Sequence, residues 1–208
     1  ANEPGRNMTF EEIKKILKTK CVGIAGAGGL GSNCAVALAR VGIGKLIIAD
    51  FDIVSEDNLN RQYFFSEQIG EKKVSALKEN ILKIDPKIDI EIHDIRLATE
   101  EIKSIYSNCD VIVEAFDLAE MKQMIIESVQ EMGNIPLVIG LGVAGWGDSN
   151  SIRVRQNHNL YICGDGKNEI AENLPPLAPR VGMVANLQAN TVLEILLNKL
   201  HIDENYTQ

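Results

Sequence analysis

The sequence predicts an α/β protein in which helices cover both faces of a mainly parallel sheet. Short apolar runs with the character of buried strands alternate with longer segments whose apolar residues recur at helical spacing. The apolar runs are nearly continuous, as expected for parallel strands that are buried on both faces. A glycine-rich stretch, GIAGAGGLGS, connects the first such run to a helical segment.

The first half of the chain supplies the clearest elements. Thr9 and Glu12 have the spacing of a capping box, and Ile13, Ile16 and Leu17 then share one helical face. Further along we expect strands at 21–25, 45–49 and 88–92 and helices at about 32–41 and 72–84. The last of these strands alternates isoleucine with acidic residues, which indicates one solvent-facing side.

The second half continues this alternation and then changes character after Gly142. We expect helices at 99–106 and 120–132 and buried strands at 111–116 and 137–141. Beyond them we expect short strands at 152–155 and 160–163, an irregular loop at 164–180 and a long helix at 181–200. No repeat or linker divides the chain, so we expect a single domain over residues 1–208.

The composition favours a globular protein without a nucleic-acid or membrane partner. Of 208 residues, 45% are hydrophobic and 24% charged, and the formal net charge is -8. Nucleic-acid binding relies on Lys and Arg to neutralise phosphates, so an acidic chain lowers that expectation. No apolar run reaches the roughly 18 residues of a membrane helix, and the N-terminal segment lacks the apolar core of a signal peptide. We therefore expect a cytoplasmic protein.

The four cysteines, Cys21, Cys34, Cys109 and Cys163, form no Cys-x-x-Cys pair. A structural zinc site built from cysteines is therefore not expected. Cys21 and Cys34 stand in apolar surroundings and are predicted to be buried as small hydrophobic residues.

The glycine-rich stretch has the pattern of a phosphate-binding turn. Gly26, Gly28 and Gly31 fit G-x-G-x-x-G between a predicted strand and helix, and Gly29 removes one more side chain. Such a turn lets a phosphate approach the backbone at a helix N-terminus, as in Rossmann-like folds. Asp50, at the end of the next strand, has the position of an acid that binds ribose hydroxyls. The alternative is a tight structural turn, and the glycines alone do not distinguish NAD from ATP.

The segment that follows the second strand, DFDIVSEDNLNRQ, favours ATP. Attack of a carboxylate on a triphosphate joins two anions and needs fixed positive charge, which Arg61 and Lys73 can supply. Asp117 follows a buried strand at the edge where ligands bind and can hold Mg²⁺. Each residue also has a structural interpretation: Arg61 as a surface ion pair, Lys72 and Lys73 as a solvated helix start, and Asp117 as an N-cap.

Together these stretches resemble the ThiF/MoeB/HesA family, the bacterial relatives of the ubiquitin-activating enzymes. The resemblance rests on GAGGLGS, DFDIVSEDNLNRQ, GEKKVSAL and EAFDLAE, and it runs from about residue 21 to 197. The chain looks most like a short, zinc-free ThiF type of thiamine biosynthesis. The resemblance implies an ATP- and Mg²⁺-dependent adenylyltransferase that activates the C-terminal Gly-Gly carboxylate of a ThiS-like sulfur carrier protein.

The resemblance also implies roles for individual residues. Catalysis falls to Arg61, Lys73 and the magnesium-binding Asp117. Asp50 binds ribose, the backbone of Gly28 and Gly29 passes the phosphates, and Gln62 supports the loop. The full set implied to bind the nucleotide is Gly26, Gly28, Gly29, Gly31, Asp50, Asp52, Asn58, Arg61, Gln62 and Lys73.

On the same basis we divide the domain into a nucleotide-binding core at about 20–142, a crossover segment at about 143–180 and a C-terminal helix at about 181–200. Without zinc, the crossover segment must be held by packing. Cys163 is the only candidate there for sulfur transfer, and a structural role is favoured because an apolar strand precedes it. Glycines at 142, 145 and 147 suggest a groove for the carrier tail. Trp146 is expected either to line this groove or to pack on the sheet.

Family members usually form homodimers in which an N-terminal arginine reaches the partner's nucleotide. Arg6 is the one arginine before the glycine turn and the candidate for this role, although a flexible terminus is the favoured interpretation. Other functions stay open at this point. They are an NAD(P)-dependent oxidoreductase, a non-catalytic interaction module, and a relative that adenylates a small molecule or a tRNA base.

Overall fold

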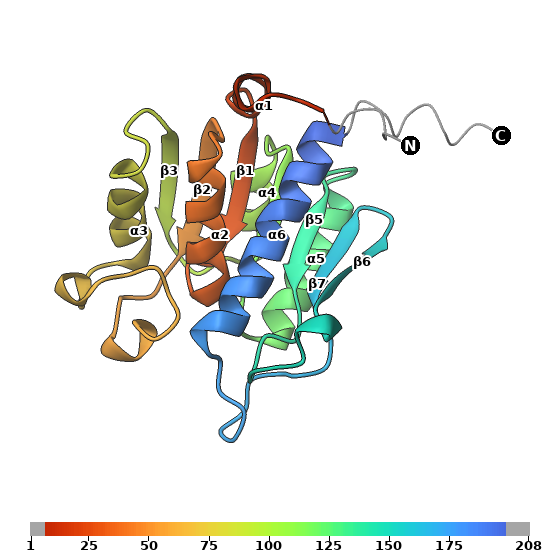
Figure 1. Cartoon of the computed structure of the whole chain (residues 1–208). Coiled ribbons are helices and arrows are strands. Elements are labelled where there is room, and N and C mark those ends of the chain that lie inside the picture. Colours follow the sequence, from red (N-terminus) through yellow and green to blue (C-terminus); the bar gives the residue numbers. More distant parts are fainter. Residues whose placement is uncertain (1–6, 199–208) are drawn as a thin grey trace.

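A single seven-stranded sheet runs through the computed structural model, which describes residues 7–198 (Figure 1). Its strands are β1 (Cys21–Ala25), β2 (Lys45–Asp50), β3 (Asp89–Asp94), β4 (Val111–Glu114), β5 (Leu137–Gly140), β6 (Arg153–Asn157) and β7 (Leu160–Gly164). Their order is β3-β2-β1-β4-β5-β7-β6. All neighbours are parallel except β6, which pairs antiparallel with β7 at one edge.

Helices cover both faces of this sheet. They are α1 (Phe10–Leu17), α2 (Gly29–Arg40), α3 (Lys73–Leu82), α4 (Thr99–Tyr106), α5 (Ala119–Glu131) and α6 (Ala178–Asn198). Helices α2, α3 and α6 bury their apolar sides in one core, and α4 and α5 enclose a second core on the opposite face (Figure 1). The predicted Rossmann-like α/β class is confirmed.

The order of the strands locates the place where a ligand can bind. From β1 the chain moves outward to β2 and β3, and it then returns to the other side of β1 to form β4 and β5. The direction of winding reverses between β1 and β4. In open α/β sheets, the crevice beyond the carboxyl ends of the strands at such a point is the usual ligand site.

Two helix starts differ from the sequence-based expectation. Helix α2 begins at Gly29 rather than near residue 32, because the glycine turn itself forms the first helical turn and Ser32 N–H already donates to Gly28 C=O at 3.0 Å. Helix α6 begins at Ala178, inside the predicted loop. Pro179 is tolerated there because a first-turn residue needs no N–H donor.

A buried ion pair holds the crossover segment against the start of α6. Arg180 donates to a carboxylate oxygen of Asp165 and, at 2.6 Å, to the C=O of Gly147. Asp165 also accepts the backbone N–H groups of Lys167 at 2.7 Å and Asn168 at 3.0 Å. Packing alone was expected here, but the polar network fastens three separate backbone stretches.

Residues 1–6 and 199–208 lie outside the described range. Arg6, the expected cross-subunit residue, falls there, as do the last two residues of the predicted C-terminal helix. Between residues 7 and 198, no helix has both the length and the apolar character needed to cross a bilayer.

Candidate functional site

Two adjoining cavities open at the carboxyl ends of β1, β2 and β4. The larger lies over the glycine turn, and Gly26, Asp50 and Lys73 contribute to its walls. The smaller lies between the glycine turn and the crossover segment. Phe116 and Asp117 line both, so the two cavities form one continuous candidate site.

The glycine turn adopts a shape that larger residues cannot copy. Gly26 has a φ of +103°, in the region that favours glycine. A Cβ at Gly31 would collide with the carbonyl oxygen of Gly26, because the helix packs directly on the turn. These two positions explain why the motif requires glycine, and they leave the N–H groups at the start of α2 close to the cavities.

Asp50 joins the end of β2 to this turn. One of its carboxylate oxygens accepts Ala27 N–H at 2.7 Å and the other accepts Asp52 N–H at 2.8 Å. Each carboxylate oxygen can accept a further bond, and the residue lines the larger cavity. Asp50 is therefore held in the position where a ribose hydroxyl can donate to it.

Lys73 reaches the larger cavity through a short antiparallel contact between two loops. Ile53 and Lys72 form an isolated bridge, and Lys73 N–H donates to Asp52 C=O at 3.0 Å. The Lys73 side chain is 7% exposed, and its ammonium lies 3.2 Å from a carboxylate oxygen of Asp52. The solvated helix start considered above therefore does not describe Lys73, although Lys72 is half-exposed.

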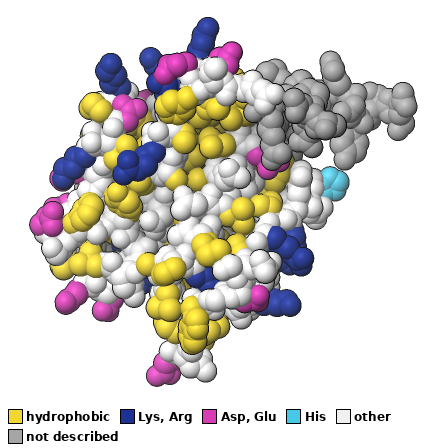
Figure 2. All heavy atoms as spheres, viewed as in Figure 1, with side chains coloured by type: hydrophobic (Ala, Val, Ile, Leu, Met, Phe, Trp, Pro, Cys, Tyr) yellow, Lys and Arg dark blue, Asp and Glu magenta, His cyan; other side chains and the backbone are white. Residues whose placement is uncertain are grey.

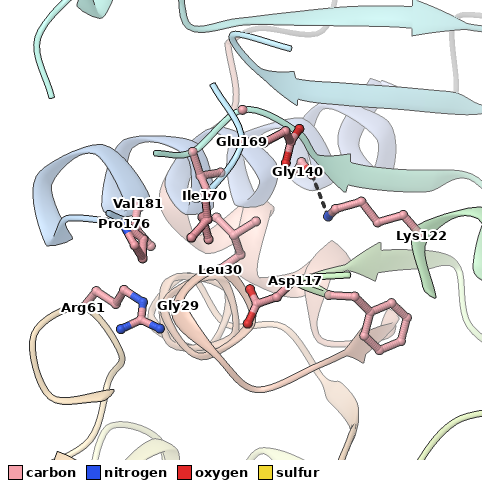
Figure 3. A pocket seen from close by; sticks show the side chains of 13 residues that line it. Gly29, Leu30, Arg61, Asp117, Lys122, Gly140, Glu169, Ile170, Pro176 and Val181 are labelled. Carbon is pink, nitrogen blue, oxygen red and sulfur yellow. Dashed lines mark hydrogen bonds between the residues drawn. The ribbon is translucent and has the colours of Figure 1, made fainter. Parts of the chain in front are cut away.

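Arg61 stands beside Gly29 in the wall of the smaller cavity (Figure 3). Its guanidinium donates to Asp57 C=O at 3.1 Å and to the Asn60 side chain at 2.8 Å. Within residues 7–198 it has no carboxylate partner, so the alternative of a surface ion pair is not observed.

Two residues of α2 that sequence reasoning missed hold the Arg61 loop in place. Asn33 donates to the C=O of both Gly29 and Arg61, at 2.7 and 2.9 Å. Ser32 accepts Tyr63 N–H at 2.9 Å. Both follow the glycine motif directly, which was the available signal, but their partners lie about one helix and one strand further along the chain.

Asp117 lines the smaller cavity, into which its carboxylate projects (Figure 3), and it also lines the larger one. Leu118, not Asp117, is the N-cap of α5, so the capping alternative does not apply. In the described part of the chain no three His, Cys, Asp or Glu side chains cluster as a metal site. A single carboxylate nevertheless fits the way Mg²⁺ binds beside nucleotide phosphates, which supply the remaining ligands together with water.

Two of the predicted residues, Asn58 and Gln62, line neither cavity. Asn58 lines neither cavity, and its side-chain oxygen accepts Ser55 N–H at 3.0 Å. Gln62 is buried beside Gly28, and its amide oxygen has no hydrogen-bond partner. The C=O of Asn58 accepts the N–H groups of Arg61 at 3.2 Å and Gln62 at 2.9 Å, so Asn58 belongs to the turn that carries Arg61.

A buried lysine–glutamate pair at the far side of the smaller cavity was not predicted. The Lys122 ammonium donates to Glu114 at 2.8 Å and to Gly140 C=O at 2.9 Å, and it lines the cavity opposite Arg61 (Figure 3). Burial raises the pKa of Glu114, although Lys122 and Phe116 N–H oppose this by stabilising the carboxylate. The available signal was a glutamate at the end of an otherwise apolar strand.

The outer wall of the larger cavity holds a second unpredicted pair. The Arg96 guanidinium lies 5.6 Å from the centre of the Phe51 ring, and both residues line the cavity with Ile95 and Leu97. A planar cation, an aromatic ring and aliphatic side chains together suit the flat, apolar face of a nucleobase.

Both the sequence and the fold of this chain match known proteins. Residues 5–208, nearly the whole chain, match the ThiF family. The chain belongs to the ThiF family. This confirms the family resemblance drawn from the glycine turn, the DFDIVSEDNLNRQ segment and the Asp117 segment.

Two relatives of this ThiF-family chain are named as adenylyltransferases. A Salmonella typhimurium molybdopterin-synthase adenylyltransferase is 28% identical over 92% of this chain and 78% of its own length. A Caenorhabditis briggsae adenylyltransferase and sulfurtransferase is 30% identical over 88% of this chain but only 47% of its own length.

Among solved structures, E. coli tRNA N6-threonylcarbamoyladenosine dehydratase TcdA in complex with ATP has the same fold. The TM-score is 0.83 at 20% identity, and the match covers 91% of this chain and 90% of the other.

Proposed function

We propose that this chain uses ATP to adenylate the C-terminal carboxylate of a small ubiquitin-like protein that ends in Gly-Gly. The observation that carries the proposal is that Arg61 and Lys73 line two cavities beside the glycine turn that meet at Asp117. Two cations and a magnesium-type carboxylate exceed what a dinucleotide's pyrophosphate needs, whereas a triphosphate attacked by an anion requires them.

The nucleotide would bind with adenosine in the larger cavity and phosphates over the turn. The base lies against Phe51 and Arg96, and the ribose donates to Asp50. The phosphates pass Gly28 and Gly29, where no side chain blocks them. Of the other residues assigned to the nucleotide, Asp52 orients the Lys73 ammonium, while Asn58 and Gln62 act through the shape of the Arg61 loop.

In the reaction, a carboxylate oxygen of the carrier attacks the α-phosphorus, and the bond to the pyrophosphate leaving group breaks. The products are an acyl-adenylate and pyrophosphate. Arg61 and Lys73 offset the repulsion between the two anions and the charge that develops on the leaving group. Bound to Asp117, Mg²⁺ would supply further charge neutralisation at the phosphates.

The smaller cavity is the proposed path for the carrier tail. Gly142 lines this cavity, and Gly142, Gly145 and Gly147 all have positive φ. Asp165 lies against Gly142 and Leu174 against Gly145, whereas the space beside Gly147 is open. Trp146 between them is 75% exposed. Figure 2 shows apolar side chains at the lower end of the molecule, where Figure 1 has the loop before α6. Ile170 is one of the exposed apolar residues of the crossover segment. At the inner end, Lys122 can donate its third N–H to the carboxylate that attacks.

A ThiS-like sulfur carrier of thiamine biosynthesis is the proposed partner, and a homodimer the proposed assembly. The first part rests on the resemblance of the sequence to short ThiF proteins. Arg6 is the proposed residue that reaches the partner's site. Cys163 is buried against Thr191, with a sulfur–oxygen distance of 3.6 Å, which supports a structural role over sulfur transfer.

One competing function has a specific observation in its favour. TcdA, named as acting on a tRNA adenosine, matches the fold over nine-tenths of both chains. The net charge of -8 weighs against an RNA substrate, because RNA binding depends on cationic side chains. A protein carboxylate therefore remains the preferred substrate.

Carrier-dependent exchange of labelled pyrophosphate into ATP tests the proposal. We expect exchange to require ATP, Mg²⁺ and the intact Gly-Gly terminus, and to disappear when the last glycine of the carrier is deleted. Asp117→Ala should lower exchange by at least about a hundredfold. Glu120→Ala, an exposed acid in the first turn of α5, is the control and should leave it unchanged.

Three results would overturn the assignment. Exchange that depends on a tRNA instead of a carrier would favour the tRNA reaction. Tight NADH binding without ATP affinity would indicate an oxidoreductase. No exchange with any Gly-Gly carrier, although ATP binds, would indicate a non-catalytic interaction module.

A further inference from the structure

Two cysteines meet at the edge of the sheet that lies opposite the candidate site. Cys21 begins β1 and Cys109 shortly precedes β4, and their sulfur atoms are 3.8 Å apart although 88 positions separate them in sequence. The backbone around them is fixed in both directions. Asp110 N–H donates to Cys21 C=O at 2.8 Å, and the Asp110 carboxylate accepts Cys21 N–H at 2.8 Å.

The two thiols have different surroundings. Cys21 is partly exposed, whereas Cys109 is buried against Gly23 and Tyr106. This corrects the expectation that Cys21 is a buried hydrophobic residue. Cys21 is thus the more accessible member of the pair, and the Cys109 sulfur lies 3.8 Å from its own.

Contact between the two thiols favours ionisation of Cys21 over Cys109. Hydrogen bonding from Cys109 lowers the pKa of Cys21, burial opposes this, and the Lys45 ammonium on β2 adds a further lowering. Asp110 and Glu91 face the same sulfur and oppose it. Cys109 has a raised pKa, because its thiol donates to Cys21 and is buried.

The other two cysteines lack these features. Burial raises the pKa of Cys34 well above its ordinary range and that of Cys163 to about 11. Both are fully buried. They serve as internal references for any thiol reagent.

From this geometry we propose that Cys21 and Cys109 form a site of reversible oxidation by hydroperoxides, independent of the nucleotide chemistry. The Cys21 thiolate attacks the peroxide oxygen, the O–O bond breaks, and Cys21 becomes a sulfenic acid while the alcohol or water leaves. The Cys109 sulfur then attacks the Cys21 sulfur. Hydroxide departs with the Cys109 proton as water, and a disulfide remains. Two thiols have been oxidised and one peroxide reduced.

The cross-link ties together the N-terminal ends of the two central strands. Bonded sulfur atoms lie about 2.05 Å apart, so the pair must close by less than 2 Å, a shift that side-chain rotation and small backbone movement can supply. Because the bond closes a long loop, it restricts the unfolded chain strongly. The oxidised protein is therefore expected to melt at least about 5 °C above the reduced one.

Oxidation of the reduced full-length chain with one equivalent of hydrogen peroxide tests the proposal. We expect two of the four thiols to disappear, a mass loss of two hydrogens, and a peptide link that dithiothreitol reverses. Cys21 and Cys34 share the tryptic peptide 21–40, so fragmentation within that peptide must assign the linked sulfur. The wild-type chain suffices, and no substitution is needed for this measurement.

A variant adds the order of events. In Cys109→Ser, Cys21 should stop at the sulfenic acid, which dimedone traps, with no cross-link formed. Three results would overturn the proposal: modification of Cys34 or Cys163 at the same rate as Cys21, a link between two chains, or a stable sulfinic acid at Cys21 with Cys109 left free.

Discussion

The core at residues 20–142 and the crossover segment at residues 143–180 fix their backbones by different means. Around the glycine turn, repeated strand–helix packing fixes the backbone, and charged side chains such as Arg61 and Lys73 are left to face a cavity. In the crossover segment the backbone is irregular, and its central charges, Asp165 and Arg180, are consumed in a buried ion pair that holds the loops together.

This difference separates charges that hold the structure together from charges that can bind a ligand. When both partners of an ion pair are buried and bonded to each other, neither can bind a ligand. Removing one partner leaves the charge of the other uncompensated in a low-dielectric interior. A cation at a cavity wall can exchange its present partner for a phosphate. Substitutions of charge in the two regions should therefore separate into losses of stability and losses of activity.

The largest expected effect is on stability, from Asp165→Asn. The neutral side chain leaves the Arg180 guanidinium buried without its counter-charge, and the free energy of unfolding should fall by about 3–5 kcal/mol. Urea denaturation followed by circular dichroism measures this. Asp148→Asn is the matched control in the same segment, since it is exposed and asparagine tolerates its positive φ, and should change stability by less than about 0.5 kcal/mol. Equal stability of both variants would mean that the ion pair does not hold the segment.

Next in size is the loss of activity in Lys73→Ala. Removing a preorganised cation should lower carrier-dependent pyrophosphate exchange by at least about a hundredfold, or about 2.7 kcal/mol in the activation free energy. Lys72→Ala is the control, because its ammonium is half-exposed and pairs with Asp94 outside the cavity at 3.2 Å. If the two substitutions reduced exchange equally, general surface charge rather than a positioned cation would explain the effect.

The core was predictable because its patterns are local and repeated. Continuous apolar runs identify the parallel strands, and the glycine motif needs only its strand and helix neighbours to be recognised. Asp50 and Asp117 follow two such strands. Since parallel strands end at one edge of the sheet, the proximity of these two acids could be inferred without coordinates.

The rest depends on contacts between segments that no pattern connects. Asp165 lies in a loop without periodicity, and Arg180 lies in the first turn of α6, which the sequence predicted as loop. Neither residue signals burial. Lys122 is an ordinary helix residue until α5 packs beside β4 and brings it to Glu114. Cys21 looked apolar by its neighbours in sequence, although in space it lies at the exposed start of a strand.

A third substitution, Lys122→Met, tests a residue whose charge both holds the structure and faces a cavity. It holds the buried Glu114 and also lines the smaller cavity, so we expect a loss of both stability and exchange, the latter by about tenfold. The double variant Glu114→Gln/Lys122→Met removes the stranded acid and should recover stability but not exchange. Recovery of both would assign Lys122 a purely structural role.

The smallest expected effect is the response of the crossover segment to acid. Burial alone would raise the pKa of Asp165, but the N–H donors of Asn168 and Lys167 and the Arg180 guanidinium outweigh it and lower this pKa below its ordinary value. The unfolded chain therefore binds a proton at a higher pH than the folded one. The stability that Asp165 provides is complete above the ordinary aspartate pKa of about 3.9 and is lost as the pH falls through its lowered folded value.

Unfolding free energies measured from pH 5 down to about pH 2 should fall more steeply for wild type than for Asp165→Asn, by at most about 1.4 kcal/mol per pH unit for one proton. Parallel curves for the two proteins would show that the Asp165 carboxylate has the same pKa in the folded and unfolded chain. The ion pair with Arg180 would then not be what stabilises the crossover segment.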